Sequence, residues 1–125
     1  MTAVRVPLAA SALALSFLAA SSLPFAPAAS AHHGWSGYDT KLETLTGTVQ
    51  EVAFGNPHAM ITLKAGEKSW HVVLAPPFRM SARGLPEGTL KTGQTVTVEG
   101  YASRSDGSEL RAERISLDGK PVELR

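Results

Sequence analysis

The chain has 125 residues, no cysteine and nearly balanced charge, with 12 basic and 11 acidic side chains. This length allows one domain with a modest core once a leader is removed. The lack of cysteine excludes disulfides and thiolate metal ligands. The lack of a basic excess argues against a nucleic-acid partner, because such proteins carry a positive electrostatic footprint.

Residues 1–31 have the organisation of a secretory signal peptide. Arg5 is their only charged residue, an apolar stretch follows it, and Ala29-Ser30-Ala31 is an A-x-A cleavage sequence. The apolar stretch is shorter than the roughly 20 residues of a membrane span, so an uncut anchor is the less favoured alternative. We expect a periplasmic protein that begins at His32 and has no stable membrane span, with cleavage after Ala28 as the other alternative.

The mature chain begins with a segment whose composition differs from that of the remaining residues. Residues 32–42 are polar and aromatic, which predicts an extended arm ahead of a barrel domain over residues 43–125. Within residues 43–54, apolar and polar residues alternate as in a half-buried strand. The alternation slips near Glu51, as a β-bulge would make it, and residues 55–57 (Gly-Asn-Pro) predict a turn.

Further strands and one short helix follow this turn. We expect strands over residues 58–64, 69–75, 94–102, 109–117 and 122–124, and two helical turns over residues 78–83. Three strands, a helix and then two strands is the order of an OB-fold. The sequence therefore predicts an all-β fold, a small OB-fold-like barrel of five to six strands with one short helix between strands three and four. An open β-sandwich is the alternative.

The predicted mature terminus carries the chemistry of a metal site. As a first residue, His32 would offer both its α-amine and its imidazole to one ion, since the amine has a pKa of about 7.7–8.0 and metal can displace its proton. A third nitrogen would complete a planar set that suits Cu(II). His58, fixed behind the turn, is the first candidate for it, and His33 and Met60 are candidates for a further ligand. Copper is thus the predicted cofactor.

We do not expect His71 to be a ligand at this site. The predicted hairpin pairs it with Thr62, which puts it roughly 13 Å from His58 along the ladder.

The sequence also offers alternative interpretations, which involve other residues. Trp35 and Tyr38 are candidate ligand contacts of a metal-free OB-fold binding module, whose partner would be a small ligand or an envelope protein. Arg79 and Arg83, one helical turn apart, predict a solvated face, with an anion site as the alternative. A copper oxygenase is the least favoured reading, because no catalytic constellation supports it. We therefore expect a protein that is not an enzyme.

The chain resembles a family of small exported bacterial proteins known as domain of unknown function 6152. The most specific shared pieces are His-His-Gly-Trp at residues 32–35 and Asn-Pro-His at residues 56–58. The resemblance implies no activity, because the family has none assigned. The histidine start alone is also similar to periplasmic copper-binding proteins and lytic polysaccharide monooxygenases, in which the first mature residue binds the metal. The strand order is similar to exported OB-fold proteins linked to ligand binding.

Overall fold

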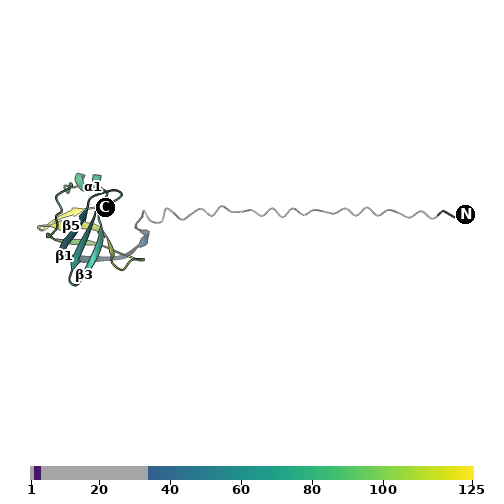
Figure 1. The fold of residues 1–125 in the computed structure, drawn as a ribbon, viewed down its shortest axis with the longest axis horizontal. Coiled ribbons are helices and arrows are strands. Elements are labelled where there is room, and N and C mark those ends of the chain that lie inside the picture. The colour runs from purple at the N-terminus through teal and green to yellow at the C-terminus, as the bar shows by residue number, and fades with distance from the viewer. Residues whose placement is uncertain (1, 4–33) are drawn as a thin grey trace.

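The computed structural model describes residues 2–3 and 34–125, and a β domain forms from the second range (Figure 1). The rest of the predicted signal peptide, together with His32 and His33, lies outside the described residues. None of the helices within the described ranges is long and apolar enough to cross a membrane.

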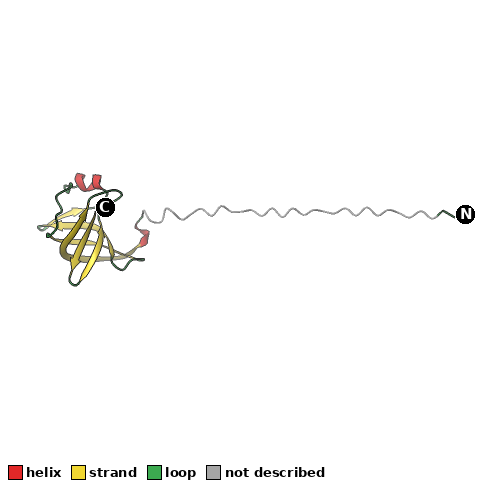
Figure 2. Ribbon diagram, in the orientation of Figure 1, coloured by secondary structure: helices red, strands yellow, loops and turns green. Residues whose placement is uncertain are grey.

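Six strands and one short α-helix make up the domain (Figure 2). In chain order the elements are the 3-10 helix η2 (Trp35–Gly37), β1 (Tyr38–Ala53), β2 (Met60–Ala65), β3 (Lys68–Val73), α1 (Pro77–Ala82), β4 (Thr95–Ser103), β5 (Glu109–Leu117) and β6 (Lys120–Glu123). β1 begins five residues earlier than the expected arm boundary, because its first residue already pairs with β4. The predicted helix is present, one residue nearer the N-terminus, with a proline at its start.

The strand connectivity confirms an all-β, OB-fold-like order. The strands follow each other in the sheet as β3-β2-β1-β4-β5-β6, and a further pairing joins β3 to β5. That pairing is parallel and matches residues 71–73 with residues 109–111. It brings β1, β2, β3, β5 and β4 into a ring that is closed by three residue pairs. β6 pairs with the later half of β5, outside this ring.

The core lies inside the ring and follows the predicted alternation. In β2 and the residue before it, Ala59, Ile61 and Leu63 are buried, whereas Met60 and Thr62 between them are only half-buried. Val72 and Leu74 are buried as expected, and Trp70 packs against the core while remaining half-buried. The other strands and α1 contribute Val49, Met80, Leu85, Leu90, Val96, Val98, Leu110, Ala112, Ile115 and Leu124.

Two glycines allow neighbouring strands to approach closely. A Cβ atom on Gly47 would lie 2.1 Å from the carbonyl oxygen of Lys64, and one on Gly100 would lie 2.1 Å from that of Arg111. The predicted bulge in β1 is present, as a register shift between Val49 and Glu51. Bulges and glycines of this kind bend strands, and here they let the short sheet coil back on itself.

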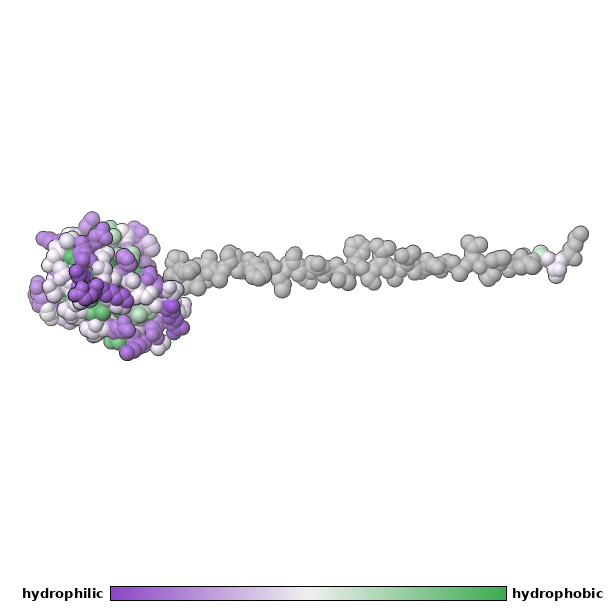
Figure 3. All heavy atoms as spheres, turned by 60° about the horizontal axis from the view of Figure 1, so that its bottom comes forward, coloured by the Kyte–Doolittle hydropathy of each residue, from purple (hydrophilic) through white to green (hydrophobic). Residues whose placement is uncertain are grey.

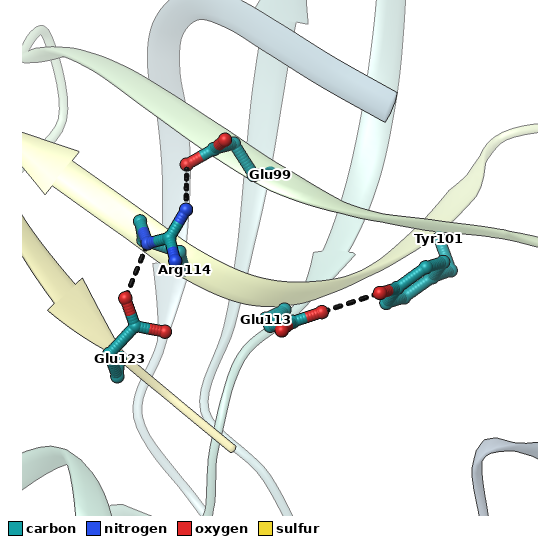
Figure 4. Close-up of polar contacts among 5 residues, drawn as sticks. All are labelled: Glu99, Tyr101, Glu113, Arg114 and Glu123. Carbon is teal, nitrogen blue, oxygen red and sulfur yellow. Dashed lines mark hydrogen bonds and ion pairs between the residues drawn. The ribbon is translucent and has the colours of Figure 1, made fainter. Parts of the chain in front are cut away.

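Polar side chains tie the later strands together on the outside. Arg114 of β5 donates to Glu99 of β4 at 2.8 Å and also bonds Glu123 at the end of β6 (Figure 4). Figure 3 shows one face of the domain on which hydrophilic residues predominate and hydrophobic residues occupy small separate areas. The helix α1 lies at one end of the strands (Figure 1), so it does not cover most of the outer surface of the sheet.

Candidate functional site

The beginning of the described domain lies against the outside of the sheet. The Trp35 ring has the guanidinium carbon of Arg111 at 4.3 Å from its centroid and that of Arg125 at 4.7 Å. Tyr101 meets the same ring edge-on, with 5.8 Å between the centroids. Each contact is of a kind that stabilises the position of an aromatic ring beyond the effect of its burial. Trp35 therefore anchors this segment, which we call the arm anchor (residues 34–38).

Three hydrogen bonds fix the backbone and the end of the arm anchor. Arg111 Nη1 donates to the carbonyl oxygen of Gly34 at 3.2 Å, and the backbone N–H of Arg104 donates to that of Gly37 at 3.0 Å. The Tyr38 hydroxyl donates to Glu109 Oε1 at 2.5 Å. The partners come from β5 and from the turn after β4, so the segment is held from two directions.

The environment of Tyr38 favours its neutral form. Burial of the ring, the hydrogen bond to Glu109 and the negative charge of that carboxylate together raise the pKa of Tyr38 from 10.0 to about 12, against a smaller opposing effect of Arg111. The phenol thus stays protonated, and able to donate, well above the pH at which a free tyrosine ionises.

We expect the contribution of this contact to stability to disappear in alkali. Between pH 10 and 12 the unfolded chain has lost the Tyr38 proton while the folded chain keeps it, so the free energy of unfolding falls as the pH rises. Urea unfolding of the wild type and Tyr38→Phe at a series of pH values measures this. The wild type has its full advantage in unfolding free energy below pH 10, and this advantage shrinks above pH 10. An advantage that is constant from pH 9 to 12 contradicts the assignment.

One row of outward-facing residues connects the arm anchor to the predicted ligands. Tyr101 pairs with Arg111, Arg111 with Val73, and Val73 with Met60. Their neighbours along the strands are buried in the core, among them Leu110, Ala112 and Ile61, so the row faces outward because side chains alternate along a strand. Val73 in the middle of the row is nevertheless covered, with 9% exposure. Adjacent strands are about 4.8 Å apart, which puts Met60 about 10 Å from Arg111 across Val73.

His58 stands just ahead of this row. It follows the Gly55–Pro57 turn and is half-buried. The next residue, Ala59, exchanges backbone hydrogen bonds with Leu74 and Ala75 at 2.9 and 2.8 Å. The backbone on the C-terminal side of His58 is therefore fixed, as the sequence indicated.

His71 pairs with Thr62, as predicted. However, His71 and Met60 line one groove of about 250 Å³ on the outer face of β1, β2 and β3, together with Glu51 and Thr62. The distance expected between His71 and His58 therefore does not apply to Met60. Met60 lies diagonally opposite His71 on the neighbouring strand. A distance counted along one ladder does not include diagonal neighbours of this kind.

The described residues contain no group of three histidine, cysteine, aspartate or glutamate side chains placed to hold a metal ion. The predicted copper site depends on His32 and His33, which lie outside these residues, so only His58 and Met60 of that set are described.

A second hollow lies beside the arm anchor. Its volume is about 290 Å³, and its lining includes Trp35, Tyr38, Tyr101, Arg104 and Arg125. The sequence pattern indicates Trp35 and Tyr38 as candidate ligand contacts, but it does not indicate the other three residues. Strand alternation could have placed Tyr101 on the outer face, whereas no sequence signal joins the arm to Arg104 and Arg125.

Comparison with known proteins identifies the family of the chain. A family model described as "Family of unknown function (DUF6152)" matches residues 20–111. No curated protein matches the chain.

Proposed function

We propose a function from geometry and chemistry, since the chain belongs to the DUF6152 family, whose function is unknown. The proposed function is that of an exported copper-binding protein, which carries or buffers copper in the periplasm. His32 supplies its α-amine and imidazole, His58 a third nitrogen, and His33 or Met60 a further ligand.

The position of the arm anchor is the observation that carries the proposal. The carbonyl oxygen of Gly34 is held by Arg111, on the same outward row as Met60. Two residues of extended chain reach at most about 7 Å, and an imidazole extends that reach. The span from Arg111 to Met60 is about 10 Å. The reach of a histidine pair directly ahead of Gly34 is comparable with this separation of the two backbones, which supports Met60 and the neighbouring His58 as its partners.

The donor types fit copper in both oxidation states. Imidazole and amine nitrogens suit Cu(II), and a thioether suits Cu(I). Because a metal ion displaces the proton of the α-amine, copper affinity should rise with pH through the range in which that amine titrates. Acetylation of the His32 amine would convert it to an amide and remove one ligand.

The test begins with the intact mass of protein expressed from Met1 and purified from the periplasm, with and without one equivalent of Cu(II). A mass that begins at His32, with copper retained through desalting, supports the proposal. We expect His58→Ala to weaken Cu(II) binding by on the order of tenfold or more, equivalent to at least about 1.4 kcal/mol.

His71→Ala is the matched control, because it removes an imidazole from the same outer face while leaving the proposed ligand set intact. It should leave Cu(II) affinity unchanged. Acetylation of the mature N-terminal amine should abolish tight binding, because it removes one ligand without adding a new amine. A mature mass that begins elsewhere, or equal affinities of the His58→Ala variant and the wild type, would rule out the proposed site.

A further inference from the structure

The hollow beside the arm anchor is independent of the copper ligands. Its aromatic side is formed by Trp35, Tyr38 and Tyr101, and two arginines, Arg104 and Arg125, line it as well. Asp39 is the acidic residue in its lining. A volume of about 290 Å³ is at the small end of the range in which proteins bind small molecules.

Positive charge at this hollow is not neutralised by ion pairs. Among residues 34–125, the ion pairs are those of Arg114, and none involves Arg104, Arg111 or Arg125. The nearby carboxylates are instead bound to neutral donors. Asp39 accepts the backbone N–H of Thr40 at 2.7 Å, Glu109 accepts the Tyr38 hydroxyl, and Glu113 accepts the Tyr101 hydroxyl at 2.6 Å (Figure 4).

Arg111, whose guanidinium carbon lies 4.3 Å from the centroid of the Trp35 ring, adds to this excess of positive charge. Its Nε is buried and has no hydrogen-bond partner among the described residues. Burial lowers the pKa of Arg111, and the positive charges of Arg125 and Arg79 lower it further, against the opposing effects of Tyr38 and Glu109. The guanidinium carbons of Arg111 and Arg125 lie 4.3 and 4.7 Å from the Trp35 centroid, so the two charges repel each other, and an anion bound beside Arg125 would relieve that repulsion.

We propose that this hollow binds a small organic anion. Its carboxylate or phosphate group is held by the guanidinium groups of Arg104 and Arg125, and its apolar or aromatic part lies against Trp35 and Tyr101. Guanidinium groups suit both kinds of oxyanion because their parallel N–H groups match the spacing of the oxygen atoms. The aromatic rings supply contact area for the remainder of such a ligand.

Trp35 can report on its own site. The chain has two tryptophans, and Trp70 is the other, so the Trp70→Phe variant of the full chain leaves Trp35 as the single indole fluorophore. Phenyl phosphate is the probe, phenol is its uncharged counterpart, and inorganic phosphate is the anionic group alone. We expect saturable quenching or a spectral shift with phenyl phosphate, and at least tenfold weaker binding of each of the other two compounds.

Arg125→Gln and Arg104→Gln, made in the same background, should each weaken phenyl phosphate binding about tenfold. Lys91→Gln, which removes a positive charge from an exposed loop away from the hollow, should leave the affinity unchanged. Linear, non-saturating quenching by phenyl phosphate would overturn the proposal, and so would equal affinities in the arginine variants and the lysine control. Inorganic phosphate that binds as tightly as phenyl phosphate would overturn the aromatic half of it.

Discussion

Replacement of Gly100 by alanine should lower the free energy of unfolding by about 1–3 kcal/mol or more, the usual cost of adding atoms to a well-packed region. The added methyl group would lie 2.1 Å from the carbonyl oxygen of Arg111 and 2.8 Å from the Cα of Ala112. Both atoms belong to the backbone of β5, so no side-chain rotation relieves the overlap. The β4–β5 ladder has to open where its register shifts, between Glu99 and Gly100.

Thermal and urea unfolding measure this effect. Gly107→Ala is the matched control, because a Cβ there meets no atom within 4 Å. The control is expected to be neutral or to gain up to about 1 kcal/mol through the reduced freedom of the unfolded chain. For a domain of this size, each kcal/mol lost lowers Tm by roughly 4–8 °C. Equal Tm values for the Gly100→Ala and Gly107→Ala proteins would show that the strands do not approach as closely as described.

The strand pattern could be predicted because it depends on local alternation. Leu45, Gly47 and Val49 share the inward face of β1, and the slip after Val49 marks the observed bulge. The Thr62–His71 pair followed from the length of the hairpin loop alone. Burial of one face forces these choices, because a register slip of one residue would expose the whole apolar set.

The arm anchor could not be predicted in the same way, because its contacts join residues far apart in the chain. Trp35 meets Arg111 and Arg125, which come from β5 and from the end of the chain. Loop-closing contacts of this kind leave no periodic signal in the sequence. The polar, aromatic composition of residues 32–42 indicated an extended segment, but it did not show that Tyr38 would already belong to β1.

The role of Arg111 also depends on the closure of the sheet. The parallel pairing of β3 with β5 brings Arg111 beside Val73, and so into the row that leads to Met60. A prediction of strand order permits this closure, but it does not give the register of the three residue pairs that form it. The relation between the arm anchor and the proposed copper ligands therefore emerges only from the assembled fold.

Leu110→Ala tests that closure directly and should cost about 2–5 kcal/mol of unfolding free energy. Leu110 is fully buried, and it pairs with Val72 of β3 on one side and with Ala102 of β4 on the other. Its loss leaves a cavity where the ring closes, and the paired backbones limit how far the strands can collapse into it. Leu42→Ala makes the same chemical change on a side chain that is 46% exposed, so it should cost much less. Urea unfolding of both variants measures the difference, and a Leu110→Ala protein as stable as the Leu42→Ala protein would contradict a core that extends through the β3–β5 junction.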